Sequence, residues 1–340
     1  MRADERKVFE VSPPEMGTIF HEALMKFSEF IAEKKMWEEV DEELCSKLMG
    51  ELAEAAAREF KKGLMFEGAV GDYRISRVKS VCERTAYMVA EHIRQGGFDK
   101  FSFEVPFGER QKIPGIEVST SNGGRVVIEG RIDRIDIAET EKGTYVKVID
   151  YKSGEEKVNR SEVISGYKMQ LMLYMTAAMG AAGKIYTDAA PAGVFYFHIH
   201  EPVADGNNAK PKDIEDFEGF LDTNFKKSFK MEGIAVNEPE IIEILDRDFK
   251  GFSQIVRVRK LKDGSVKGTG DFSALTKDEF NELMCSTAKK TEDLCNEFTK
   301  GSVAVSPLKV SDDSGACSYC KYKSICNFDV RLPGFIYRKG

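Results

Sequence analysis

Two β-prone runs joined by a short connection hold the polar residues that most constrain the fold of this chain. The first run is E-G-R-I-D-R-I-D, residues 129–136, and the second is V-I-D-Y-K-S-G, residues 148–154. Side chains two positions apart share one face of a strand, so Asp150 and Lys152 are predicted to point the same way. Runs joined by a short connection commonly become neighbouring strands, which brings Asp133 toward them. The sequence therefore predicts two carboxylates and a lysine on adjacent strands.

These side chains are the ones that metal-assisted phosphodiester cleavage requires. Asp133 and Asp150 are the candidate ligands, and hard carboxylate oxygens favour Mg²⁺ or Mn²⁺ over zinc. Lys152 is the candidate group that orients the attacking water or stabilises charge on the phosphate. A salt-bridged strand end is the structural alternative. Asp136 is the rival ligand, but three positions along a strand it faces the other side, where a surface or pairing role is more natural.

The following segment, G-Y-K-M-Q-L-M-L-Y at 166–174, offers two further polar groups. It lies within a helix predicted over 161–183, and the i, i+4 spacing of Gln170 and Tyr174 places both on one face of that helix. Amides and phenols hydrogen-bond backbone phosphates and active-site lysines, so both residues are candidates for the site. Two polar residues at the border of a buried helix face are the alternative.

Composition defines the class of protein. With 340 residues, 42% hydrophobic and 31% charged, the chain can bury one large core or two modest ones. Its apolar runs are shorter than the ~20 residues that span a bilayer, and no signal-peptide pattern follows the polar N-terminus, so a cytoplasmic location is predicted. The net charge of −7 argues against a broad basic face for nucleic acid. Attraction to DNA would then come from bound cations, local basic clusters or a partner subunit.

The order of elements predicts an α/β fold with a central mixed sheet flanked by helices. Residues 1–100 are predicted to be a helical lead-in, and residues 101–200 the α/β core with its β-rich runs. Residues 201–275 contain charged and glycine-containing stretches, which are typical of an insertion with a β-hairpin arm. Residues 276–340 are predicted to hold a long helix and a cysteine-containing tail. One domain in four parts is expected.

Three of the seven cysteines stand close together near the C-terminus, in C-S-Y-C-K-Y-K-S-I-C. An odd number of cysteines in a protein of this class favours reduced thiols or metal ligands over disulfides. A loop-rich segment with Cys-x2-Cys-x5-Cys is typical of a metal or iron–sulfur site, although three thiolates are one short of a full set. The candidate cluster ligands are Cys317, Cys320 and Cys326.

Several residues elsewhere are candidates for a fourth ligand. A competing zinc site would add a histidine from H-x-H, His198 or His200, although histidines at strand ends are more often surface residues. Cys45 and Cys82 have apolar neighbours at helical spacing and are predicted core residues. The remaining cysteines are Cys285 and Cys295.

Together, G-R-I-D133, D150-Y-K152 and Q170-L-M-L-Y174 resemble the motifs of the RecB-like branch of the PD-(D/E)XK nucleases, in order, spacing and strand–strand–helix context. The resemblance implies a restriction-endonuclease-like core and DNA cleavage that depends on Mg²⁺ or Mn²⁺. It also implies further metal ligands. These are His21 in G-T-I-F-H-E-A-L, Glu104 in F-S-F-E-V-P-F and the main-chain carbonyl of Tyr151.

Within that group, the cysteine ending resembles the iron–sulfur staple of AddB-type subunits of helicase-nucleases, and the likeness covers most of the chain. It implies a [4Fe-4S] cluster with a fourth cysteine upstream of the G-x-x-x-H helix. Residues 1–20 contain no cysteine, and AddB-type subunits are far longer. An excised C-terminal domain, in which the cluster can be absent, is therefore expected.

The implied function is an exonuclease domain that cleaves single-stranded DNA at unwound ends during double-strand break repair. The implied partners are DNA and an AddA-type helicase-nuclease subunit. Two alternatives from other classes stay open at this point. One is a non-catalytic DNA-binding or scaffolding module with a structural iron–sulfur or zinc site, and the other is a zinc hydrolase built on His198 and His200.

Overall fold

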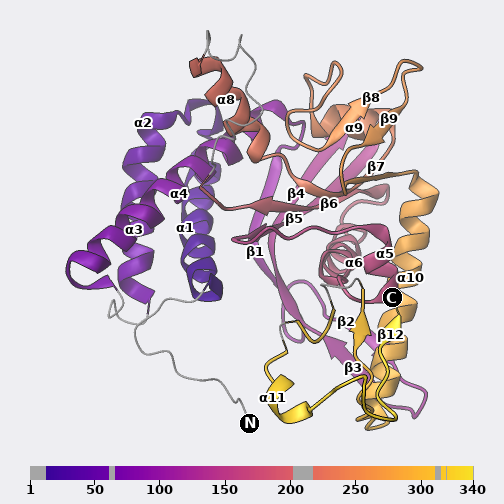
Figure 1. Ribbon diagram of the computed structural model, residues 1–340. Helices are drawn as coiled ribbons and strands as arrows, with labels where there is room; N and C mark the ends of the chain where they lie inside the picture. The colour runs from indigo at the N-terminus through magenta and orange to yellow at the C-terminus, as the bar shows by residue number, and fades with distance from the viewer. Residues whose placement is uncertain (1–12, 61–65, 202–216, 311–314, 319, 340) are drawn as a thin grey trace.

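The N-terminal helices form a block beside the central sheet (Figure 1). The computed structural model describes residues 13–60, 66–201, 217–310, 315–318 and 320–339. An apolar stripe that includes Leu24, Phe27 and Ile31 is buried, as the helical spacing predicts. Cys45 and Cys82 are buried too, which confirms them as core residues. The elements of the block are α1 (Pro13–Lys34), the 3-10 turn η1 (Trp37–Glu39), α2 (Glu42–Leu44), the π-helical turn η2 (Cys45–Met49), α3 (Gly50–Glu59) and α4 (Gly68–Gln95).

A mixed sheet of six strands forms the centre of the molecule, in the order β1-β4-β5-β6-β7-β10. Its strands are β1 (Lys100–Phe107), β4 (Gly130–Thr140), β5 (Gly143–Lys152), β6 (Ala189–His198), β7 (Glu232–Val236) and β10 (Ser273–Leu275). The β1–β4, β4–β5 and β6–β7 pairs are antiparallel, whereas β5–β6 and β7–β10 are parallel. The predicted α/β fold with a central mixed sheet is therefore confirmed.

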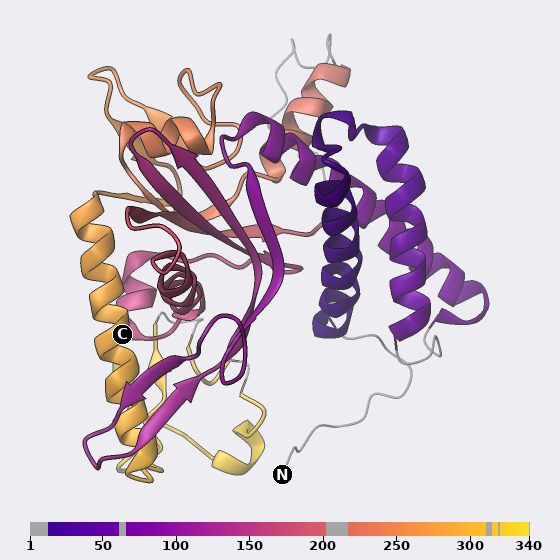
Figure 2. The same ribbon diagram turned by 180° about the vertical axis from the view of Figure 1, so that it is seen from behind.

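The helix predicted over 161–183 is in fact two helices, α5 (Arg160–Ser165) and α6 (Gln170–Ala182). The chain breaks at Gly166, whose φ of 85° is a left-handed conformation that glycine adopts without strain. As the connection between parallel β5 and β6, α6 packs on the face of the sheet opposite to α4 (Figure 2). This break starts α6 at Gln170, beside the end of β5.

The segment predicted to be an insertion, 201–275, contributes to the core. Its β7 is buried throughout and lies between β6 and β10 in the central sheet. A short apolar run such as E-G-I-A-V carries little periodic signal, and its strand identity depends on its neighbours in the sheet. The hairpin of β8 (Val258–Lys260) and β9 (Val266–Gly268) does form, as predicted. Residues 202–216 lie outside the described part, and α8 (Phe217–Ser228) and α9 (Pro239–Leu245) complete the segment.

The long C-terminal helix α10 (Lys277–Thr299) begins with a capping box between Thr276 and Glu279. It runs along the side of the molecule and supports the hairpin of β2 (Ile116–Ser119) and β3 (Arg125–Ile128), shown from behind in Figure 2. Asn296 Oδ1 accepts a hydrogen bond from the backbone of Ser121 in the hairpin turn. The chain ends with β11 (Leu308–Lys309), α11 (Lys323–Cys326) and β12 (Arg338–Lys339). Within the described residues, no helix combines the length and the hydropathy needed to cross a membrane.

His92 on α4 is buried on the side of the sheet that faces the helical block, next to Phe197 of β6. Neither ring nitrogen hydrogen-bonds to a described residue. Burial lowers its pKa to about 3, and the nearby cations Lys147 and Arg134 act in the same direction.

This pKa predicts a loss of stability in acid. Above the ordinary pKa of 6.5, His92 is neutral in both states and costs nothing. As the pH falls from 6.5 toward 3, the unfolded chain binds a proton that the folded chain refuses, so the free energy of unfolding decreases. Urea titrations across this window should show a steeper loss in the parent than in His92→Leu. Parallel curves would contradict the buried neutral imidazole.

Candidate metal and active site

Three side chains from three separate elements meet at one end of the sheet. His21 comes from α1, Glu104 from β1 and Asp133 from β4, and one potential ligand atom of each lies within 4.8 Å of the others. His21 Nδ1 is 3.4 Å from Asp133 Oδ2 and 3.6 Å from Glu104 Oε1. Among the described residues, this is the only group of three or more histidine, cysteine or acidic side chains arranged in this way.

Local backbone structure explains how these groups converge. In the β1–β4 register, Phe103 pairs with Arg134 and Val105 with Ile132, so Glu104 lies across from Asp133. Glu104 has a φ of 45°, a left-handed conformation that is unfavourable for a non-glycine residue. Such strain persists where surrounding contacts impose it, and it commonly marks functional sites. Here the strained residue directs its carboxylate toward the imidazole of α1.

His21 is held by acceptors on both sides of its ring. Nε2 lies 3.0 Å from the main-chain oxygen of Tyr151, and Nδ1 faces the two carboxylates. Burial lowers the pKa of His21, but the carboxylates of Asp133 and Glu104 outweigh burial and raise it to about 10. The ring therefore contributes the positive charge of this group in the absence of a metal.

Asp150 and Lys152 share one face of β5 beside this group, as the strand periodicity predicts. Lys152 Nζ lies 2.6 Å from Asp150 Oδ2. That oxygen is buried, and the contact lacks the alignment of a hydrogen bond, so its lone pairs are poorly satisfied. Burial and the neighbouring charge of Asp133 raise the pKa of Asp150 to about 6. Asp133 itself accepts a 2.7 Å hydrogen bond from the backbone N–H of Tyr151, which joins β4 to β5 at the site.

Gln170 and Tyr174 hold Lys152 in place from α6. The Lys152 ammonium donates to Gln170 Oε1 at 3.0 Å, and Gln170 Nε2 donates to the Tyr174 hydroxyl at 2.8 Å. The predicted i, i+4 pair therefore extends the row that begins at Asp150. The ring of Phe107 meets Tyr174 edge-on, with centroids 6.0 Å apart.

The glycine that precedes the Asp133 motif has a steric role that sequence reasoning missed. A Cβ at Gly130 would lie 2.8 Å from the ring of Phe107 and 3.7 Å from that of Tyr174. Contacts under 3.0 Å force a neighbour to move, so the backbone of β4 approaches these rings as closely as only glycine permits. Arg131 was missed as well. Its exposed guanidinium lies 3.5 Å from Glu104 at the rim of the site.

Asp136 faces the opposite side of the sheet, as predicted, but it is fully buried and not on the surface. It accepts hydrogen bonds from Arg134 at 2.6 and 2.8 Å and pairs with Lys147 at 2.8 Å. The proposed pairing role is therefore correct and the surface role is wrong. Burial raises the pKa of Asp136, but the two cations outweigh burial and hold it below its usual range.

The donor set fits a hard divalent cation. Carboxylate oxygens and one imidazole converge, and the buried Oδ2 of Asp150 is a poorly satisfied lone-pair donor beside them. The ligand set expected from the sequence is not gathered equally. Asp150 lies outside the 4.8 Å group, and the carbonyl of Tyr151 is engaged by His21. His21, Glu104 and Asp133 are therefore the residues best placed to hold a cation.

The other candidate metal residues are not brought together. Cys317 and Cys326 are half-buried and Cys320 is exposed. His198 lies 2.8 Å from the carbonyl of Glu156, and His200 stacks on a phenylalanine ring. None of these belongs to the ligand group found among the described residues. The zinc hydrolase interpretation gains no support from this arrangement, and the iron–sulfur site stays a prediction.

Comparison with known proteins adds an independent line of argument. The family model of the PD-(D/E)XK nuclease superfamily matches residues 1–327. The chain is 32% identical over 341 residues to the AddB-type subunit of the ATP-dependent helicase/deoxyribonuclease of Caldanaerobacter subterraneus subsp. tengcongensis, covering 100% of this chain. It is 33% identical over 335 residues, or 98% of this chain, to the protein of that name from Clostridium novyi. The chain spans only 29% of the length of these two relatives.

The family match and the geometry agree on the same residues. G-x-x-D, D-Y-K and Q-x-x-x-Y contribute the neighbouring Asp133, Asp150, Lys152, Gln170 and Tyr174, on the strands and helix that their spacing predicts. The match covers all but the last residues of the chain. This protein is a member of the PD-(D/E)XK nuclease superfamily.

Proposed function

We propose that this domain is a Mg²⁺-dependent deoxyribonuclease that belongs to a helicase-nuclease and hydrolyses single-stranded DNA at unwound ends. The names of the similar proteins, which combine helicase and deoxyribonuclease, support this assignment. The proposed partners are an AddA-type helicase-nuclease subunit and the DNA strand it unwinds. The proposed setting is the repair of double-strand breaks, with Cys317, Cys320 and Cys326 as ligands of a [4Fe-4S] cluster in the full-length subunit.

The single observation that carries the proposal is the continuous contact from Asp150 through Lys152 and Gln170 to Tyr174, beside the group of three cation ligands. A structural salt bridge would not need a lysine that is only partly buried and held on two sides. Such a fixed ammonium at a water-accessible edge is suited to a charge that develops during reaction.

The roles of the side chains follow from their positions. When bound, Mg²⁺ supplies Lewis acidity toward the phosphate and lowers the pKa of a water molecule. His21, Glu104 and Asp133 would hold it, with Asp150 next to them. Lys152 would orient the attacking water or stabilise the charge that develops on the phosphoryl oxygens. Water adds to phosphorus, the bond from phosphorus to O3′ breaks, and O3′ takes a proton, leaving 5′-phosphate and 3′-hydroxyl ends.

A cleavage assay on single-stranded DNA tests this proposal. The parent should cleave in Mg²⁺ or Mn²⁺ and not in EDTA, and Asp150→Ala should be at least about a hundredfold slower, as for the loss of a group that supports metal ligands. The matched control is Asp271→Ala, which removes a half-exposed carboxylate paired with Lys157. If parent and Asp150→Ala are equally inert with saturating DNA and Mn²⁺, the domain is a DNA-binding or scaffolding module instead.

Gly130→Ala should lower cleavage although it changes no polar group. Its methyl group would displace Phe107 and, through the edge-on ring contact, the hydroxyl that holds Gln170. Small displacements of positioning groups reduce rates by about tenfold to a hundredfold. The control is Gly251→Ala, where an added methyl group meets no atom within 4 Å. Equal cleavage rates for the two variants would show that the close approach at Gly130 has no catalytic consequence.

A further inference from the structure

A cavity of about 630 Å³ lies between α5, α10 and the C-terminal β11–β12 ribbon. Two cations line it, Lys290 on α10 and Arg338 on β12, and no carboxylate of a described residue does. Lys290 makes no ion pair with any described residue, and Arg338 uses only its Nε, toward the carbonyl of Ser306 at 2.7 Å. The cavity therefore offers positive charge that is not neutralised by the described residues around it.

The position of Lys290 is fixed by the end of α5. Its side-chain carbon Cε would lie only 2.7 Å from a Cβ at Gly166, so the aliphatic stem runs across this glycine. Gly166 also has a φ of 85°, which a side chain would strain. Two independent features thus require glycine there, and together they set the ammonium at the wall of the cavity.

The remaining walls suit a nucleotide. Ser161, Ser165 and Tyr167 add hydroxyl-bearing side chains, and Ile164 and Leu294 add partly exposed apolar surface. Proteins that bind single-stranded nucleic acid combine cations for the phosphates with aromatic or apolar surface for the bases. The cavity contains both kinds of group.

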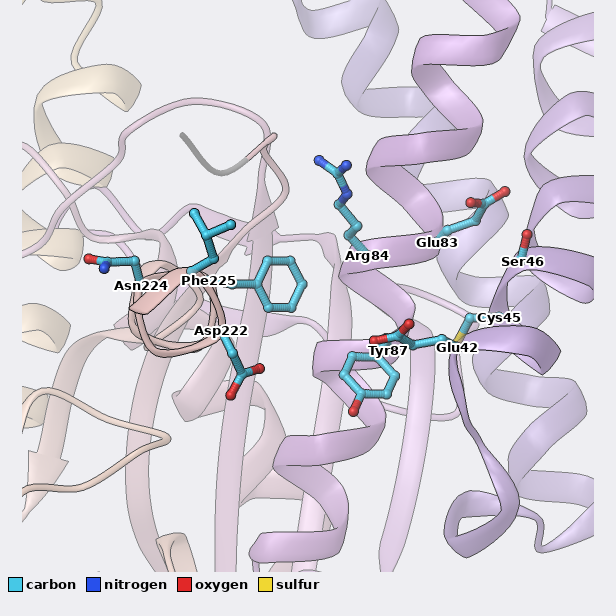
Figure 3. A pocket seen from close by; sticks show the side chains of 10 residues that line it. Glu42, Cys45, Ser46, Glu83, Arg84, Tyr87, Asp222, Asn224 and Phe225 are labelled. Atoms are coloured by element: carbon cyan, nitrogen blue, oxygen red, sulfur yellow. The ribbon is translucent and has the colours of Figure 1, made fainter. Parts of the chain in front are cut away.

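A second cavity, of about 580 Å³, shows that charge distinguishes the two (Figure 3). It lies between α2, η2, α4 and α8, and its lining includes three carboxylates, Glu42, Glu83 and Asp222, against one cation, Arg84. This cavity would repel a phosphate. The two cavities are similar in size, and only the one beside α5 has the sign of charge that attracts DNA.

The cavity beside α5 is also close to the cleavage site along the chain. Gly166 lines the cavity and Gln170 holds Lys152, so the connection between them spans at most about 14 Å. That distance corresponds to a few nucleotides, since phosphates of one strand are about 3.4 Å apart along the axis of a duplex and farther apart in an extended strand.

We propose that this cavity binds the phosphate and base of one nucleotide of single-stranded DNA, a few nucleotides away from the bond that is cleaved. Lys290 and Arg338 contact the phosphate, and Tyr167 with Ile164 and Leu294 contacts the base. The inference rests on the proposed nuclease function, because it takes DNA to be the substrate.

The test measures binding without cleavage. The affinity of the parent for a fluorescent short oligothymidylate is determined in EDTA at several salt concentrations. Lys290→Gln and Arg338→Gln should each bind several-fold more weakly, and the salt dependence of log Kd should fall by about 0.7 for each cation lost. Lys290→Arg keeps the charge and should retain most of the affinity. Lys289→Gln is the matched control, since this exposed neighbour on α10 is paired with Glu292 and Asp293.

The outcomes separate the pocket from the function. Equal weakening by Lys290→Gln and Lys289→Gln would mean that only net charge matters, and unchanged binding by Lys290→Gln would also overturn the proposal. Photo-crosslinking from an iodouracil-substituted oligonucleotide should label the peptide that contains Tyr167, and labelling confined to other peptides would overturn it too. A chain that cleaves DNA but binds independently of Lys290 rejects the pocket alone. A chain that binds through Lys290 but never cleaves rejects the nuclease function alone.

Discussion

Replacing Lys152 by Met is expected to lower the rate of DNA cleavage by about three orders of magnitude, the size of effect seen when a preorganised charge is removed from an active site. The ammonium lies 2.6 Å from Asp150 Oδ2 and 3.0 Å from Gln170 Oε1, so it is fixed before the substrate arrives. Methionine fills a similar volume without charge. The measurement is the single-turnover rate on single-stranded DNA in saturating Mg²⁺.

A second measurement separates chemistry from cation binding. Lys152 contacts none of the three residues best placed to hold the cation, so Mn²⁺ affinity by calorimetry should be close to that of the parent. Lys157→Met serves as the control, because Lys157 is half-exposed and paired with Asp271. A variant that loses Mn²⁺ binding and cleavage together would assign Lys152 to the structure of the site and not to the reaction.

Asp136→Asn is expected to decrease the free energy of unfolding by about 3–5 kcal/mol, the usual cost of leaving buried charges without their partner. Asp136 is fully buried and is the carboxylate that pairs with both Arg134 and Lys147. Two cations would remain in an interior where Lys147 stands 4.0 Å from the ring centroid of Phe98. Burial already lowers the pKa of Lys147, so loss of its proton limits the damage.

Urea denaturation of parent and variant gives this value directly. Asp271→Asn removes an exposed partner of an ion pair and should change the free energy of unfolding by less than about 1 kcal/mol. An equally small change for Asp136→Asn would mean that the buried cluster is not held together by its anion. Because the cluster lies on the opposite side of β4 from Asp133, a folded fraction of the variant should keep its cation site.

Local spacing was sufficient to predict the centre of the site. Asp150 and Lys152 had to share a face of any strand that contained them, and Gln170 and Tyr174 a face of any helix. Neither prediction depends on where the chain goes afterwards. The resemblance added His21 and Glu104, which lie on elements far away in the sequence and carry no local signal of their own. The structure brings both of them to Asp133.

Features that depend on tertiary contacts were not accessible in this way. The role of Gly130 depends on two rings from β1 and α6, and the burial of Asp136 depends on cations that match it across two strands. The strand identity of β7 depends on its neighbours in the sheet, because a five-residue apolar run is ambiguous by itself. The left-handed backbone of Glu104 is imposed by its surroundings and has no signature in the residue type.

The helical block is as much a part of the reaction centre as the sheet. Its first helix, α1, contributes the imidazole that meets Glu104 and Asp133, and Gly17 in the same helix faces Ser153, just after Lys152. A shortened chain that started at β1 would retain the D-Y-K strand and the Q-x-x-x-Y helix but lose a ligand of the cation. Any minimal catalytic fragment must therefore include α1, and engineering that swaps or loosens this helix alters metal affinity before it alters the sheet.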